Sequence, residues 1–116
     1  MNSIEELKKE LESKTLTVKW KILSDIGPNW IGSSRNITFY LDKLPFEGSD
    51  FYNFMTDKLV EVIKIPSTSE DHVITGFGVF ILEDSDLLIQ YETQANIPYD
   101  DKFNFENGIK TFITNI

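Results

Sequence analysis

Residues 72–94 read HVITGFGVFILEDSDLLIQYETQ, and this stretch sets our expectation for the central part of a sheet. Its first half is almost wholly apolar or small, which is typical of a central strand covered on both faces. Its second half places Leu87, Ile89 and Tyr91 on one face with period two. An acidic turn over residues 83–86 separates the halves, so the sequence predicts an antiparallel β-hairpin.

Two more strands are indicated upstream of the hairpin by the same alternation. The first carries the apolar set Leu16, Val18, Trp20 and Ile22. The second carries Ile37, Phe39 and Leu41. Residues 24–35 between them are predicted to be a loop, because glycine and proline interrupt the pattern.

Three segments carry helical signals. Ser3 and Glu6 form a capping box at the start of the first. The second is predicted from about Asp50 to Ile65, although the β-branched residues within 58–65 leave a strand open as the alternative for its end.

The third helix is predicted to begin at a cap formed by Asp100 or Asn104. Its apolar residues lie at helical spacing: Phe105, Ile109, Phe112, Ile113 and Ile116. The element order is therefore α-β-β-α-β-β-α. We expect a single α+β domain over residues 1–116, with a mostly antiparallel four-stranded sheet and helices packed on it.

The composition indicates a small globular domain in a reducing compartment. The chain has 116 residues and no cysteine, and its first residues carry neither a basic nor an apolar signal segment. Its apolar runs are all shorter than the ~18–20 residues that span a bilayer. We therefore expect a cytoplasmic protein.

Charge is unevenly distributed along the sequence. The net charge is −8, and residues 67–107 hold nine acidic residues but only one basic residue, Lys102. The rest of the chain is neutral overall. An acidic protein repels nucleic acids and anionic membranes, so a basic protein partner is the better expectation.

The sequence offers little material for catalysis. His72 is the single histidine and is predicted to start a strand, where a surface role is more usual than a catalytic one. Asp84 and Asp86 have the spacing of a calcium loop, but its other ligands are missing. Gly76 and Gly78 are interpreted as sites where a helix packs closely on the sheet. We expect no enzymatic activity, no cofactor and no metal.

The general features of the chain resemble those of one class of proteins. In size, acidity, lack of cysteine and lack of catalytic residues, the chain resembles the small immunity proteins that bacteria pair with secreted nuclease toxins, including those of contact-dependent growth inhibition. The resemblance implies an inhibitor that neutralises a basic toxin through an acidic surface. It involves no shared motif and implies no particular fold.

On this hypothesis the partner-binding residues are Glu83, Asp84, Asp86 and Glu92, with Tyr91 as an aromatic anchor. One alternative is a small-molecule-binding or enzymatic domain with a pocket between sheet and helices, lined by Trp20, Trp30, Phe39, Tyr40, Phe77 and Phe80. Another is a structural or adaptor subunit that dimerises through an exposed sheet edge or a surface apolar patch.

Overall fold

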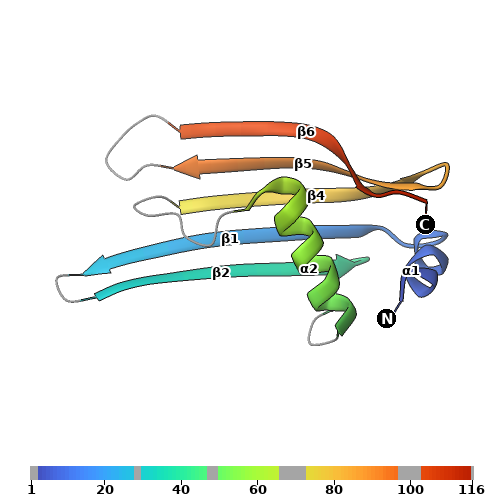
Figure 1. Cartoon of the computed structure of the whole chain (residues 1–116), viewed down its shortest axis with the longest axis horizontal. Coiled ribbons are helices and arrows are strands. Elements are labelled where there is room, and N and C mark those ends of the chain that lie inside the picture. The colour runs from blue at the N-terminus through green and yellow to red at the C-terminus, as the bar shows by residue number, and fades with distance from the viewer. Residues whose placement is uncertain (1–2, 28–29, 47–49, 66–72, 97–102, 116) are drawn as a thin grey trace.

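Eight elements make up the described part of the chain in a computed structural model (Figure 1). They are α1 (Ile4–Leu11), β1 (Leu16–Gly27), β2 (Trp30–Leu41), β3 (Leu44–Phe46), α2 (Asp50–Ile63), β4 (Val73–Glu83), β5 (Asp86–Asn96) and β6 (Phe103–Ile113). The structure describes residues 3–27, 30–46, 50–65, 73–96 and 103–115, with the backbone alone for 23–27, 30–34, 46, 96 and 103–105.

All six strands form one antiparallel sheet in the order β3-β2-β1-β4-β5-β6. The predicted fold was therefore wrong in its strand and helix numbers. The described residues form six strands and two helices, not four strands and three helices, although helices and an antiparallel sheet are still combined.

The first correction concerns the predicted loop over residues 24–35. Residues 24–27 continue β1 and 30–35 begin β2, and the register pairs Ser24 with Ser33 and Gly27 with Trp30. The ladder is made by backbone groups, so a polar or glycine-containing segment pairs as well as an apolar one once its turn is tight. Gly27-Pro28-Asn29 supplied a turn signal that we placed inside a longer loop.

The second correction concerns the predicted C-terminal helix. Residues 103–113 form β6, which pairs with β5 from Asn96–Phe103 to Leu87–Ile113. Its apolar residues match a helical period by coincidence, because Phe112 faces the core while Ile109 is 60% exposed on the other side of the sheet. The capping role predicted for Asp100 falls outside the described residues.

Other predictions are confirmed. Ser3 caps α1 by accepting a hydrogen bond at its Oγ from the Glu6 backbone N–H at 3.2 Å. β4 and β5 form the expected hairpin, paired from Val73–Asn96 to Glu83–Asp86. β4 also lies centrally, between β1 and β5.

The segment 58–65, left open between helix and strand, continues α2 as far as Ile63. Lys64 then takes a left-handed conformation with φ 61°, and the Ile65 N–H donates to the Val60 carbonyl at 3.3 Å. This six-to-one hydrogen bond is the Schellman ending of a helix, with Ile65 buried beside it. Burial of Leu59 and Ile65 outweighs the weak strand preference of the β-branched residues.

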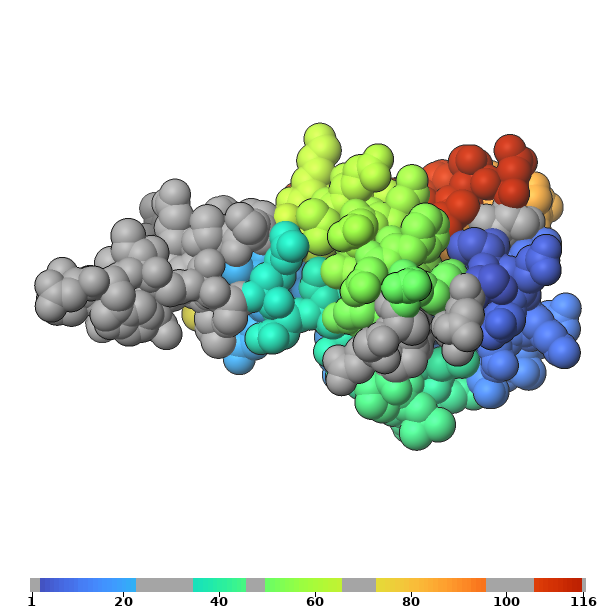
Figure 2. Space-filling model, turned by 60° about the horizontal axis from the view of Figure 1, so that its bottom comes forward, coloured from blue at the N-terminus to red at the C-terminus, as the bar shows by residue number. Residues whose placement is uncertain are grey.

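α2 crosses one face of the sheet and is fixed at both ends. Near its start, the Tyr52 hydroxyl donates to the Ile37 carbonyl of β2 at 2.5 Å, and the Tyr52 ring lies edge-on to Phe39. Near its end, Lys110 Nζ of β6 donates to the Val62 carbonyl at 3.3 Å. Figure 2 shows α2 (green) on the surface between β2 (cyan) and β6 (red).

The core lies between α2, α1 and this face of the sheet. Its fully buried side chains include Leu7 of α1, Met55 and Leu59 of α2, and several from the strands: Leu16, Val18, Ile22, Phe39, Leu87, Ile89 and Phe112. Gly76 of β4 leaves the space that the Trp20 indole of β1 fills, since a Cβ there would overlap the ring. The glycines thus make room for cross-strand side chains, not for a helix as predicted.

The opposite side of the sheet is covered by neither described helix. We call it the open face, and it carries Lys19, Tyr40, Phe77, Val79, Gln90 and Ile109. The expectation that β4 is covered on both faces was therefore wrong for the described residues. Ile81, for example, is 37% exposed. Within those residues, no helix is long and apolar enough to cross a membrane.

Candidate protein-binding face

Three of the predicted partner-binding residues lie at the tip of the β4–β5 hairpin. Glu83 ends β4, Asp84 lies in the turn with φ 56°, and Asp86 begins β5 directly opposite Glu83. Glu83 and Asp84 are exposed. The Asp86 Oδ1 accepts a hydrogen bond from the Asn115 N–H at 3.2 Å, which holds the end of the chain beside the tip.

Glu92 lies on the same face of the sheet as Glu83 and Asp86. Side chains alternate along a strand, so Glu92, six residues from Asp86, returns to the same side at a distance of about 20 Å. Glu92 is exposed. The structure therefore brings three of the four predicted carboxylates to one face, with the hairpin tip at one end and Glu92 near the middle of β5.

Tyr91 does not lie with these carboxylates. Its side chain is 5% exposed and lies on the covered face, where its hydroxyl donates to Glu106 Oε1 at 2.9 Å. Lys110 Nζ lies 5.6 Å from the centre of its ring. The predicted aromatic anchor is a residue of the interior, because the period-two pattern that placed it beside Leu87 and Ile89 also directs it inward.

The Tyr91 phenol gives a pH-dependent prediction. Burial, and then the hydrogen bond and charge of Glu106, raise its pKa above the ordinary value of 10.0. Because the folded-state pKa is raised, the stabilising contribution is present below about pH 10 and is lost as pH rises through the folded-state pKa. In ultraviolet titrations, the difference between wild type and Tyr91→Phe should show a midpoint above that of free tyrosine. A midpoint at or below it would contradict this environment.

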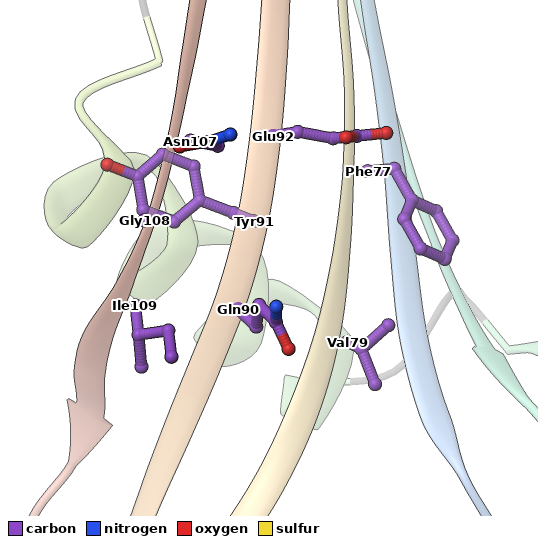
Figure 3. A pocket seen from close by; sticks show the side chains of 8 residues that line it. All are labelled: Phe77, Val79, Gln90, Tyr91, Glu92, Asn107, Gly108 and Ile109. Carbon is purple, nitrogen blue, oxygen red and sulfur yellow. The ribbon is translucent and has the colours of Figure 1, made fainter.

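Two rows of residues cross the open face near Glu92. The register aligns Lys19, Phe77, Glu92 and Asn107 in one row. The next row is Thr17, Val79, Gln90 and Ile109. On the β4–β6 side these rows enclose an open pocket of about 450 Å³, drawn in Figure 3 with Phe77 and Ile109 on opposite sides.

The pocket combines apolar walls with a carboxylate and two amide side chains. Val79 and Ile109 provide aliphatic surface, and Glu92 provides a carboxylate. The amide side chains of Gln90 and Asn107 each add an acceptor oxygen as well as an NH₂ donor. Such a lining suits a side chain with an aliphatic stem and a cationic end, as lysine and arginine have.

The part of the open face on β4, β5 and β6 carries the negative charge of Glu92 and is the acidic half. The part on β1 and β2 carries positive charge and is the basic half. A second pocket of about 440 Å³ is lined by Thr17, Lys19, Tyr40, Lys43 and Phe77. Lys19 Nζ lies 5.8 Å from the centre of the Tyr40 ring. Two strand spacings separate Lys19 from Glu92, or about 10 Å, and Phe77 stands between them.

The acidic half is not neutralised by this basic half in the described structure. Among the described residues, Glu83, Asp84 and Glu92 have no lysine or arginine within ion-pair distance. Of the other acidic residues counted in the sequence, Glu70, Asp71, Asp100 and Asp101 lie outside the described residues, as does His72. The described part of the chain also holds no cluster of three or more potential metal ligands.

The pocket residues other than Tyr91 and Glu92 are not among the predicted partner-binding residues, for two reasons. Phe77 and Val79 were assigned to a strand covered on both faces, and Phe77 was expected only in a pocket between the sheet and the helices. Asn107 and Ile109 were assigned to a helix. The signal that could have found them is the alternation of β4 and β5 itself, which sets Phe77 and Val79 on the face opposite Leu87 and Ile89.

Comparisons of the chain with protein-family models, curated proteins and solved structures found no match. We therefore infer its function from its own residues.

Proposed function

We propose that this chain is a non-catalytic protein-binding module, and that a basic partner protein docks on the open face of its sheet. One observation carries the proposal: exposed apolar side chains share that face with carboxylates that form no ion pair with a described basic residue. Ile81 and Ile109 are 37% and 60% exposed, and Glu83 and Glu92 lie among them. Protein interfaces combine such apolar surface with polar groups.

The pattern of β4 supports a covered state for this face. Apolar residues occur on both sides of β4, as in strands that are buried on both faces. The described helices cover one side only. Apolar surface left on the other is the usual mark of an interaction site.

The pocket beside Glu92 supports a basic partner. A lysine or arginine of the partner would lay its stem on Val79 and Ile109 and pair its charge with Glu92. The hairpin tip, with Glu83 and Asp84, would add long-range attraction and faster association. Lys19 and Lys43, on the other half, would repel a misoriented basic surface and so favour one orientation.

A basic toxin domain of the nuclease type fits these requirements. Such domains are basic around their substrate groove, and an acidic partner competes there or binds beside it. The protein would then act as an immunity protein in the cytoplasm of the producing bacterium. This is the role that the size, acidity and lack of catalytic groups suggested.

The small-molecule alternative receives less support from the described residues. It requires a pocket between the sheet and the helices, where Trp20, Phe39 and Phe80 are each at most 5% exposed and pack in the core. Phe77 and Tyr40, which were expected to line the same pocket, lie on the open face. The Trp30 side chain lies outside the described side chains.

The proposal predicts salt-sensitive binding that depends on Glu92. The partner to test is the protein encoded beside this gene, with affinity measured by calorimetry at low and physiological salt. We expect Glu92→Gln to weaken binding about tenfold and Glu92→Lys about a hundredfold, because reversal adds repulsion to the lost pair. Far-ultraviolet circular dichroism should show that both variants are folded, since Glu92 is exposed.

The matched control is Glu61→Lys, which makes the same charge change on the exposed side of α2, away from the open face. It should alter the affinity less than twofold. Equal losses from Glu61→Lys and Glu92→Lys would show that net charge alone matters and would overturn the assignment of the open face. A neighbouring gene product that is acidic, or that does not bind, would remove the inhibitor role.

A further inference from the structure

β6 is an edge strand of the sheet that the described residues form. It spans 11 residues and, within the described chain, pairs only with β5. In an edge strand, alternate backbone N–H and C=O groups point away from the sheet and can pair with another strand. At the other edge, β3 is three residues long and contains Pro45, which discourages such pairing.

The charges of β6 are arranged symmetrically about one glycine. Glu106 and Lys110 lie two residues before and after Gly108, so all three belong to the same face. Glu106 is exposed and Lys110 half-buried. The two charges cancel, which makes β6 a neutral edge on a chain of net charge −8.

From this arrangement we propose that β6 pairs antiparallel with β6 of a second copy, about a twofold axis at Gly108. Glu106 of each copy then lies opposite Lys110 of the other, with Cβ atoms about 5 Å apart. At the axis, two glycines face each other without side-chain crowding. Moving the centre of the pairing to either neighbouring residue removes both charge pairs, so the edge favours a single register.

The contacts within one copy leave these groups able to pair. Glu106 accepts the Tyr91 hydroxyl at Oε1, and its second oxygen remains. Lys110 uses one of three N–H donors on the Val62 carbonyl. On the other face, the partner strand would cover part of Ile109, now 60% exposed. The two sheets would form one continuous sheet, with their open faces side by side.

The association is expected to be weak, because edge pairing buries less surface than the ~800 Å² per partner of stable complexes. A dissociation constant of roughly 10–100 μM would follow. Sedimentation over about 1 μM to 1 mM should therefore show a monomer–dimer equilibrium. A protein that stays monomeric throughout would overturn the proposal.

Charge reversal tests the register. Glu106→Lys and Lys110→Glu should each weaken self-association at least tenfold, since like charges then face each other. An equimolar mixture of the two variants should form a heterodimer, because both pairs are again of opposite charge. A mixture that remains monomeric, or single variants that still dimerise, would refute this pairing. The control Glu61→Lys on α2 should leave self-association unchanged.

A cysteine cross-link provides a test that does not alter charge. The chain contains no cysteine, so Gly108→Cys introduces a single thiol. At the axis the paired Cα atoms would lie about 5 Å apart, within reach of a disulfide. Oxidised Gly108→Cys should form a covalent dimer faster than Ile109→Cys, which is more exposed but lies opposite residue 107. Equal or reversed rates would contradict the proposed axis.

Discussion

Replacing Phe112 with alanine is expected to lower the free energy of unfolding by about 3–5 kcal/mol, whereas Ile109→Ala should change it by less than about 0.5 kcal/mol. Phe112 is 1% exposed, and its ring meets that of Phe80 edge-on, with centroids 4.8 Å apart and planes at 87°. Removing it leaves a cavity in the core. Ile109 is 60% exposed on the open face and leaves no cavity.

The two substitutions together distinguish a strand from a helix over residues 103–113. In a helix, residues three apart share one face, so both changes would be costly. In a strand they lie on opposite faces, so one is costly and the other is not. Urea unfolding followed by circular dichroism gives both values. Similar losses for the two variants would contradict β6. Should Phe112→Ala fail to fold, Phe112→Leu allows the same comparison with a smaller loss.

Four of the six strands could be predicted in part because several signals agreed. β1 and β5 have one apolar and one polar face over most of their length, and the acidic turn joined β4 to β5. α1 has a capping residue, and its apolar residues Ile4, Leu7 and Leu11 pack on the core. For α2, a buried face outweighed the β-branched residues near its end. In each case the local pattern and the tertiary burial require the same structure.

β6 could not be predicted because its pattern is degenerate. Phe105, Ile109 and Phe112 fit a helical period, yet as an edge strand β6 exposes Ile109 and buries Phe112. Gly108 was the contrary signal. It is disfavoured inside a helix, whereas in β6 it lies beside the Tyr91 ring, 3.4 Å from where a Cβ would be.

Only part of the candidate site was predicted, because one sequence pattern again fits two structures. Acidic residues can be recognised in any sequence, so Glu83, Asp84, Asp86 and Glu92 were named. The apolar residues beside them were not named, because a strand with two apolar faces has the same sequence pattern whether a helix or a partner protein covers it. Only the placement of α2 on one side shows that Phe77 and Val79 belong to the uncovered side.

Replacing Gly76 with alanine is expected to destabilise the protein by about 3 kcal/mol, although it adds a single methyl group. That methyl would overlap the indole of Trp20, which is 3% exposed and enclosed by the core, so the ring cannot move aside freely. Gly108→Ala is the matched control. Its Cβ would meet the Tyr91 ring at 3.4 Å, an ordinary contact, and should change stability by less than about 0.5 kcal/mol.

A double-mutant cycle tests the cause of the loss. In a Trp20→Leu background the smaller side chain leaves room over Gly76, so Gly76→Ala should then cost less than about 1 kcal/mol. The coupling of about 2 kcal/mol would assign the loss to the contact between the methyl group and the indole. The same cost in both backgrounds would instead assign it to the backbone of β4. The overlap between the added methyl group and the Trp20 indole would then not be the source of the loss.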